Sequence, residues 1–265
     1  MAARSKNPDE EKNRIQTYRK MMDVLGCFST VDRRLSLAQI AESARLPRTT
    51  VHRILAALRE IGFIEQDARG GNYGLGIRLF ELGSLTLANM DLHREAKPFA
   101  DRLARLAGEA VHVGVFNGND IVVVDREESV DRPTNNSTLI ETAPTYCTGV
   151  GKAVLAFQDR QVIAKIIKNG LKRFTNNTIT TESALARELA KIRRQGFAID
   201  QGEHQIWVHC VAAPIRNANG RVFAAISVTG PAERISEDRI PILSGQVMQT
   251  ADSISRQLGY RDDAT

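Results

Sequence analysis

The feature that most constrains the fold is a stripe of apolar residues at helical spacing in residues 47–61. When each residue turns the helix by about 100°, the stripe occupies roughly 60° of the circumference. Its members are Val51, Ile54, Leu55 and Leu58. Pro47 suits the first turn of a helix, and Gly62 suits the position just after its end. The pattern predicts an amphipathic helix that buries one face.

Two further helices and a hairpin are predicted around this helix. Apolar spacing predicts a first helix over residues 15–28, and Ser36 is the expected N-cap of a second that ends near residue 44. Strand-like residues 63–66 and 72–75 flank a turn that contains Gly70 and Gly71. Three helices followed by such a hairpin are typical of a winged helix-turn-helix. We assign it residues 15–76, after a disordered tail over residues 1–14.

The polar side chains of the third helix are candidates for reading DNA. They lie opposite the apolar stripe or on its flanks: Arg48, Thr49, Thr50, His52 and Arg53. Arginine can hold the O6 and N7 atoms of guanine together, and threonine can bind a phosphate or contact the thymine methyl group. Arg69, beside two glycines at the tip of the hairpin, is expected to approach the phosphate backbone.

The distribution of charge agrees with a polyanionic partner for this domain. The whole chain has a formal charge of +5, and residues 1–90 hold 14 Lys and Arg against 10 Asp and Glu, a net +4. A local basic excess fits DNA without proving it. Two alternatives stay open: the polar residues could simply be solvated, and a winged helix can also serve only for protein contact.

A linker helix is predicted over residues 77–91. Its apolar residues spread beyond one narrow stripe, so it needs burial on more than one side. A second copy of the chain is the expected source of that burial.

Residues 92–260 are predicted to form a second domain, followed by a short tail over residues 261–265. Strand pairs at residues 111–116 with 121–126 and 208–215 with 222–228 each enclose an Asn- and Gly-containing turn. Helices are expected at residues 149–157, 183–195 and 237–258. This order predicts an α+β domain with a mainly antiparallel sheet.

The rest of the sequence points to a cytoplasmic protein. The N-terminus has no apolar segment of the kind found in signal peptides, and no apolar run approaches 18 residues. The three cysteines, Cys27, Cys147 and Cys210, are far apart and match neither a disulfide framework nor a zinc site.

Several motifs, in order along the chain, resemble those of the IclR-type bacterial transcription regulators. The recognition-helix motif is matched by residues 46–55, LPRTTVHRIL, and the end of the wing by residues 73–76, YGLG. In the second domain, residues 149–153 (GVGKA), 193–200 (RRQGFAID), 210–215 (CVAAPI) and 224–231 (AAISVTGP) also match. The resemblance runs from about residue 15 to residue 260.

This resemblance implies a winged-helix DNA reader joined by a linker helix to a GAF-like effector domain. It implies homodimers, or dimers of dimers, on palindromic operator DNA. Family members mostly regulate catabolic, transport or efflux genes, often as repressors, in response to small organic acids, sugar acids or aromatic compounds. No catalytic activity, cofactor or metal is implied.

The resemblance also assigns effector-binding residues. Around the glycine turn and the later strands it points to Gly149, Val150, Asp200, Cys210, Ser227 and Thr229, and Asn135, Ala143 and Trp207 complete the set. Backbone N–H groups of residues 149–151 at a helix start can receive a carboxylate. Ser227 and Thr229 alternate on a strand, so both hydroxyls face one way.

Each of these residues also has an ordinary structural interpretation. The glycines can serve only a tight turn, Cys210 can be a small buried apolar residue, Asp200 can brace a loop, and Trp207 can serve ordinary packing. Two departures from the family pattern, the polar run at residues 132–137 and Trp207 where the family has glycine, favour a polar ligand or one that stacks on the indole.

Two other functional classes are weighed against a regulator. An enzyme would use Cys147 or Cys210 as nucleophile with His112, His204 or His209, yet the sequence contains no nucleophile elbow, metal spacing or phosphate loop. A purely architectural DNA binder would leave the nearly neutral second domain without a role. Sensing a small molecule explains that domain better.

Overall fold

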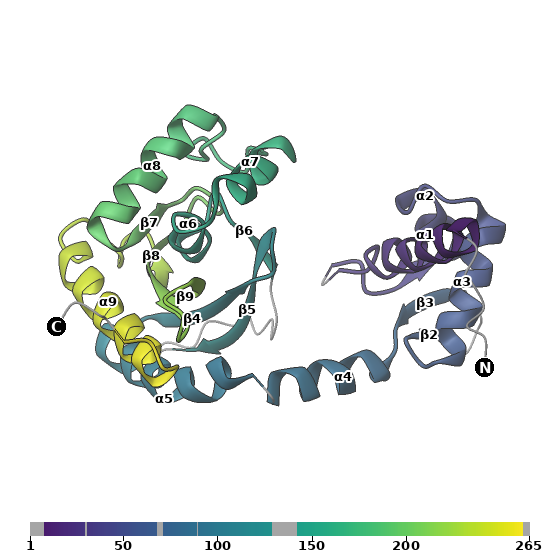
Figure 1. Ribbon diagram of the computed structural model, residues 1–265, viewed down its shortest axis with the longest axis horizontal. Coiled ribbons are helices and arrows are strands. Elements are labelled where there is room, and N and C mark those ends of the chain that lie inside the picture. Colours follow the sequence, from purple (N-terminus) through teal and green to yellow (C-terminus); the bar gives the residue numbers. More distant parts are fainter. Residues whose placement is uncertain (1–7, 30, 68–70, 89, 129–141, 262–265) are drawn as a thin grey trace. The chain divides into compact units, whose positions relative to one another are not determined.

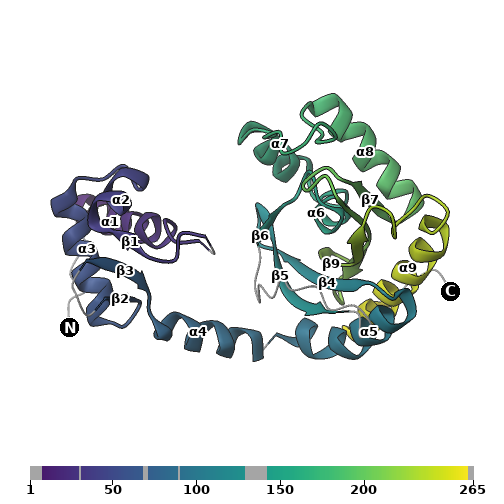
Figure 2. The same cartoon turned by 180° about the vertical axis from the view of Figure 1, so that it is seen from behind.

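The computed structural model describes residues 8–29, 31–67, 71–88, 90–128 and 142–261. The chain divides into two compact units, residues 1–87 and 88–265. Their elements are labelled in Figure 1, and Figure 2 gives the opposite view. Among the described residues, no helix combines the length and the apolar character that crossing a membrane would require.

The first unit is a winged helix-turn-helix, as predicted. Its helices are α1 (Pro8–Leu25), α2 (Leu37–Ser43) and α3 (Arg48–Glu60), followed by α4 (Ile77–Ala88), whose last residue falls in the second unit. Its strands are β1 (Leu35–Ser36), β2 (Ile64–Gln66) and β3 (Asn72–Leu75). The strands form one antiparallel sheet in the order β1-β3-β2. The wing is therefore the β2–β3 hairpin with β1 along its other edge.

The core of this unit is the predicted stripe. Val51, Ile54, Leu55 and Leu58 are buried against residues of α1, α2 and the sheet, among them Val24, Ile40 and Ile64. Ser36 caps α2 as expected: its hydroxyl accepts from the backbone of Gln39, whose side chain accepts from the backbone N–H of Ser36. Such a reciprocal cap fixes where the helix begins.

Two glycines bring the end of α3 close to the start of α4. Gly62 has φ +76°, the left-handed conformation that glycine adopts without strain. A Cβ atom at Gly76 would lie 2.2 Å from the carbonyl oxygen of Gly62. Only glycine fits at this second position.

Some predicted boundaries in this unit are wrong. The first helix begins at Pro8, so residues 8–14 are helical rather than part of a disordered tail. Proline at a helix start and the acidic residues 9–11 in its first turn favour helix there. Pro47 caps α3 rather than occupying its first turn, and β1 was not predicted because two residues carry no periodic pattern.

The second unit is built on a six-stranded sheet in which every pairing is antiparallel. The strands are β4 (Ala110–Phe116), β5 (Asp120–Glu127), β6 (Thr142–Pro144), β7 (Ala198–Gln201), β8 (Val208–Arg216) and β9 (Val222–Pro231). Their order is β6-β5-β4-β9-β8-β7. Helices α5 (Asp91–Ala107), α6 (Gly149–Leu155), α7 (Arg160–Lys168), α8 (Glu182–Gln195) and α9 (Ile240–Gln257) surround it. The predicted α+β class is confirmed.

Helices cover both faces of this sheet, as Figures 1 and 2 show. Helices α5 and α9 pack on one face, where Val111, Val211 and Val228 belong to their apolar cluster. Helix α6 packs on the other face against Cys210, Ala212 and Ala225, with α7 and α8 behind it. Alternate residues of each strand therefore meet different helices.

Three elements of this unit were not predicted. Strands β6 and β7 have three and four residues at the two edges of the sheet, too few for a clear alternation. Helix α7 was also missed. The last helix begins at Ile240 rather than at residue 237, because a turn at residues 236–239 precedes it.

Candidate functional site

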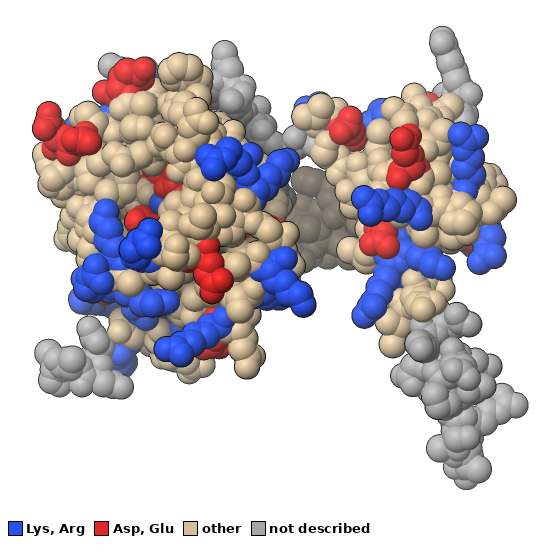
Figure 3. Space-filling view, turned by 90° about the horizontal axis from the view of Figure 1, so that it is seen from above, with Lys and Arg blue, Asp and Glu red and all other residues tan. Residues whose placement is uncertain are grey.

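The first candidate site is the exposed side of α3. Arg48, Thr49, His52 and Arg53 are exposed and Thr50 is half-buried, while the apolar stripe is turned inward. Figure 3 shows more Lys and Arg than Asp and Glu on the face of this unit that is in view. Arg69 lies outside the described residues. The helix therefore presents donors to solvent along one continuous face.

Ion pairs brace the base of the wing next to this face. Arg34 pairs with Glu65 at 2.5 Å and with Asp67 at 3.0 Å. The guanidinium of Arg59 on α3 donates to the side chain of Gln66 on β2 at 2.6 Å. The Arg34 pairs join the wing to the segment before β1, and the Arg59 bond joins it to α3.

The second candidate site is a polar row on the α6 face of the second unit. Asp200 of β7 is the register partner of Cys210 of β8, which is the partner of Thr229 of β9. The Thr229 hydroxyl lies 3.3 Å from the Cys210 sulfur and 3.3 Å from the Ser227 hydroxyl. Four residues assigned from the resemblance thus lie together on three neighbouring strands.

The glycine turn at the start of α6 lies directly on this row. A Cβ atom at Gly149 would come within 2.6 Å of the Cys210 sulfur, and one at Gly151 within 2.5 Å of the Thr145 Cα atom. Val150 is buried in the same cluster. The glycines are needed for close approach of α6 to the sheet, so the tight-turn interpretation and the proximity to Cys210 both hold.

One of the three backbone N–H groups expected to receive a carboxylate at this turn already has a partner. The hydroxyl of Thr148 accepts from the N–H of Gly151 at 3.2 Å and donates to the carbonyl of Pro144 at 2.7 Å. The N–H of Gly151 is therefore already engaged and is not available to a carboxylate.

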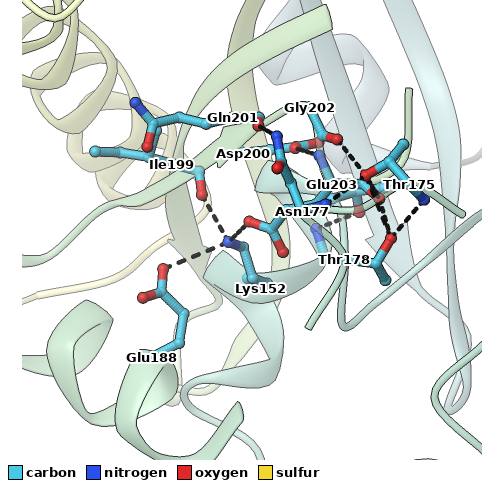
Figure 4. A network of polar contacts seen from close by, with 12 residues as sticks. Lys152, Thr175, Asn177, Thr178, Glu188, Ile199, Asp200, Gln201, Gly202 and Glu203 are labelled. Carbon is cyan, nitrogen blue, oxygen red and sulfur yellow. Dashed lines mark hydrogen bonds and ion pairs between the residues drawn. The ribbon is translucent and has the colours of Figure 1, made fainter. Parts of the chain in front are cut away.

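Behind the turn, Lys152 is buried with only 1% of its surface exposed. Its ammonium donates to Glu203, to the carbonyl of Ile199 at 2.7 Å and to Glu188 at 3.4 Å, as Figure 4 shows. Burial alone would lower the pKa of this ammonium, but Glu203 and Glu188 hold that pKa above its ordinary value. The Lys152 side chain therefore stays charged and ties α6 to the end of β7.

The same network fixes Asp200. A carboxylate oxygen of Asp200 accepts from the backbone N–H of Glu203 at 2.7 Å. The hydroxyls of Thr175 and Thr178 donate to the carbonyls of Gly202 and Glu203 at 2.6 Å each, so the turn after β7 is held from a second side. Asp200 braces a loop, as one interpretation expected, and also belongs to the polar row.

Burial shifts the acid groups of this region. It raises the pKa of Asp200 to about 6, opposed by the N–H of Glu203 and by Lys152. It also raises the pKa of Glu203 to about 7, against the opposing attraction of Lys152. The two carboxyl groups change charge between mildly acidic and neutral pH.

The cysteines lack the features of a nucleophile. Burial raises the pKa of Cys147 to about 12 and that of Cys210 to about 11, so both thiols stay protonated at neutral pH. A catalytic cysteine needs a lowered pKa. The arrangement therefore favours Cys210 as a small buried residue of a binding surface.

The remaining assigned residues lie elsewhere or are not described. Ala143 of β6 pairs with Ile121 of β5, whose side chain packs with α6, so it shares the face but not the row. Trp207 is 74% exposed on the turn before β8, so little of its side chain is packed within this single chain, and stacking of a ligand on it stays a prediction. Asn135 lies outside the described residues.

Sequence reasoning missed the central role of Lys152. It appeared only as a letter of the glycine-turn motif, although a lysine within the apolar run Val150–Leu155 is itself a signal of a buried charge. Its partners Glu188 and Glu203 lie far away in the sequence, so no spacing could identify them.

Comparison with known proteins agrees with this architecture. The family model described as "Bacterial transcriptional regulator IclR C-terminal" matches residues 84–256, and the one described as "IclR helix-turn-helix domain" matches residues 19–68. The HTH-type transcriptional repressor AllR of Salmonella typhi is 35% identical over 227 residues, 85% of this chain and 84% of AllR.

A second relative and a solved structure extend the match. The HTH-type transcriptional regulator KdgR of Escherichia coli K12 is 30% identical over 255 residues, 96% of this chain and 97% of KdgR. An IclR homolog from Microbacterium hydrocarbonoxydans, solved with 4-hydroxybenzoate, has a TM-score of 0.73 at 26% identity and covers 91% of this chain and 98% of its own. With its helix-turn-helix unit and its antiparallel second unit, the chain belongs to the IclR family of bacterial DNA-binding transcriptional regulators.

Proposed function

We propose that this chain is a cytoplasmic homodimeric repressor of catabolic or transport genes whose second unit binds a small organic acid. The observation that carries the proposal is the separation of roles in the structure. One unit exposes a donor-rich helix face suited to DNA, and the other gathers hydroxyl, thiol and carboxyl groups on one face of a sheet. The first arrangement supports binding DNA, and the second supports sensing.

For DNA, α3 enters the major groove with Arg48, Thr49, His52 and Arg53 toward the base edges and phosphates. Arg53 is the proposed base reader because a guanidinium can hold guanine in a two-bond contact. Thr50 and Arg69 are assigned to the phosphate backbone. Backbone contacts orient the domain, and base contacts select the operator.

For the effector, the polar row of Asp200, Cys210, Thr229 and Ser227 is the proposed binding surface, together with the turn at Gly149. Hydroxyl and carboxyl groups can hydrogen-bond an oxygen-rich metabolite. The homolog from Microbacterium hydrocarbonoxydans was solved with 4-hydroxybenzoate, an acid with a second polar group. We assign Val150, Ala143, Asn135 and Trp207 to the outer part of the same site.

The dimer contact is proposed to use α4. Its apolar side chains are exposed in the single chain: Ile77, Phe80, Leu82 and Leu85. An exposed apolar face of this kind marks an interface. A second copy would bury it and would place two α3 helices on a palindromic operator, and pairing of dimers would give a tetramer.

The effector changes DNA affinity only through its preference for one of two arrangements of the dimer. A ligand shifts such an equilibrium by as much as its affinities for the two states differ. No covalent chemistry is needed, and the protonated cysteines supply no nucleophile.

Fluorescence anisotropy on DNA upstream of the chain's own gene tests this proposal, at a stated salt concentration and with excess random competitor. Binding that survives the competitor, and that a small organic acid weakens, is expected. Binding lost to the competitor on this DNA and on all fragments from a random-sequence selection would overturn it. Specific binding that no small molecule alters would instead favour an architectural DNA binder.

A further inference from the structure

His112 of β4 extends the polar row by one strand. Its register partner on one side is Ser227 of β9, and on the other side is Arg126 of β5. Paired residues of neighbouring strands share a face. The neighbours of His112 along the strand, Val111 and Val113, belong to the apolar cluster of α5 and α9. The imidazole therefore lies on the α6 face, next to Ser227.

The imidazole is half-buried there, and one of its two ring nitrogens has no partner among the described residues. Its Nε2 atom is inaccessible and makes no hydrogen bond within the part of the chain that the structure describes. Burial, and then the positive charge of Arg126, lower the pKa of His112 to about 4, so the ring is neutral at neutral pH. A buried polar atom without a partner costs stability, and no hydrogen bond within the described ranges offsets that cost for this nitrogen.

The row changes character along its length. At one end, Asp200 supplies carboxylate oxygens beside the Cys210 thiol and the Thr229 hydroxyl. At the other end, Ser227 and the imidazole lie beside Arg126, whose guanidinium forms an ion pair with Glu128 at 2.6 Å, so the donor that the ligand meets there is the imidazole. A ligand that matches both ends needs an anionic or strongly accepting group near His112 and a hydroxyl or oxo group near Thr229.

The distance between the Thr229 and His112 side chains sets the size of that ligand. Thr229 is two residues from Ser227 on β9, and His112 is one strand further, so the two side chains are roughly 8 Å apart. This distance suits a small acid with two polar groups across a ring or a short chain.

We infer that His112 is an effector-binding residue whose imidazole donates a hydrogen bond to the carboxylate of a hydroxy or oxo acid, with the acid's second polar group near Thr229. The inference rests on the proposed function, because it assigns orientation and ligand class to the same site. In this orientation the carboxylate of the ligand lies near β4 of the sheet rather than at the glycine turn of residues 149–151.

The test uses the full-length protein and titration calorimetry with named pairs of probes. The acids are 4-hydroxybenzoate, 3-hydroxybenzoate and glycolate, and the neutral partners are the corresponding alcohols. The wild-type chain is expected to prefer at least one acid over its alcohol. In His112→Leu that preference is expected to fall about tenfold, while His112→Gln, which keeps a donor, retains most of it.

The melting temperature of the free protein separates binding from a structural role. Because His112→Leu removes an unpartnered polar atom, the ligand-free variant is expected to melt at the same temperature as wild type or higher. His209→Leu is the matched control. His209 lies on the opposite face of the sheet, where its Nδ1 atom is 3.2 Å from the carbonyl of Ile235, and this variant should keep the acid preference.

Four outcomes would overturn the inference. His112→Leu could keep the wild-type preference for acids, or it could lower the melting temperature and leave acid binding unchanged. The wild-type chain could also bind none of the acids while still binding operator DNA, which would remove the ligand class and leave the proposed regulator intact. Failure of the wild-type chain to bind any DNA selectively would overturn both proposals.

Discussion

The exposed face of α3 and the α6 face of the second sheet are both polar, but they are built in opposite ways. The α3 face comes from one continuous helix, and its charged groups are solvated. The sheet face comes from strands far apart in the sequence, and its polar residues Asp200, Cys210 and Ser227 are buried. A solvated charge costs little to keep, whereas a buried one needs a partner.

This difference determines whether a substitution can change ligand or DNA recognition without changing the stability of the unit. On α3, the apolar stripe maintains the fold and the polar residues are left for recognition. On the sheet, Lys152 and Asp200 stabilise the very segments that form the proposed site. Substitutions should therefore separate the two roles on α3 and mix them on the sheet.

Removing the Lys152 charge should have the largest effect. In Lys152→Met, Glu203 loses its buried partner, and the free energy of unfolding of the second unit is expected to fall by about 3–5 kcal/mol. Urea unfolding followed by circular dichroism and by fluorescence of Trp207, the chain's single tryptophan, measures this. Lys165→Met on the exposed side of α7 is the control, and an equal loss in both variants would contradict a buried ion pair.

The buried acid Asp200 should make stability depend on pH. Its pKa is raised in the folded state, so its contribution is present below the ordinary aspartate pKa near 4 and is lost as the pH rises through about 6. Asp200→Asn cannot ionise and keeps an acceptor for the Glu203 N–H. Relative to wild type, it should gain up to about 3 kcal/mol in unfolding free energy above pH 7.

Unfolding of both proteins at pH 4.5 and pH 8 checks this prediction. The gap between variant and wild type is expected to close at the lower pH. A gap that is constant across this range would mean that Asp200 does not titrate there.

On α3, recognition should change without stability. Arg53→Ala is expected to weaken operator binding by about 1–3 kcal/mol and to change the unfolding free energy by less than about 0.5 kcal/mol. Anisotropy on operator and random DNA at one salt concentration measures the first effect. Arg187→Ala, which removes an exposed arginine of α8 in the second unit, is the control. Equal losses of Arg53→Ala on both DNAs would exclude base reading by Arg53.

The smallest expected effect is at the cap of α2. Ser36→Ala removes the hydroxyl that accepts from Gln39, which should cost about 1 kcal/mol of stability in the first unit. Thermal unfolding by circular dichroism detects this change. Ser43→Ala at the other end of the same helix should be nearly neutral, and a matching loss there would show that the cap contributes little.

The elements that could be predicted from sequence were those whose pattern lies within one continuous segment, as it does on α3. The α3 stripe, the Ser36 cap and the four long strands were predicted because each pattern is contained in a few consecutive residues. The edge strands β6 and β7 and the start of α1 were missed or misplaced. Short strands carry too little periodicity, and a helix start in a polar segment carries no apolar signal.

In the second unit, the sequence determined which residue types were available, and motif resemblance pointed to Asp200, Cys210, Ser227 and Thr229. Only the tertiary structure decided that three strands place these residues side by side and that Lys152 joins Glu188 and Glu203. It also decided that the Nε2 atom of His112 is enclosed with no hydrogen-bond partner in the described part of the chain. Helical stripes and caps depend on neighbours a few residues away, so sequence determines them directly. Cross-strand rows and buried ion pairs depend on register and chain topology, which become fixed only when the whole unit folds.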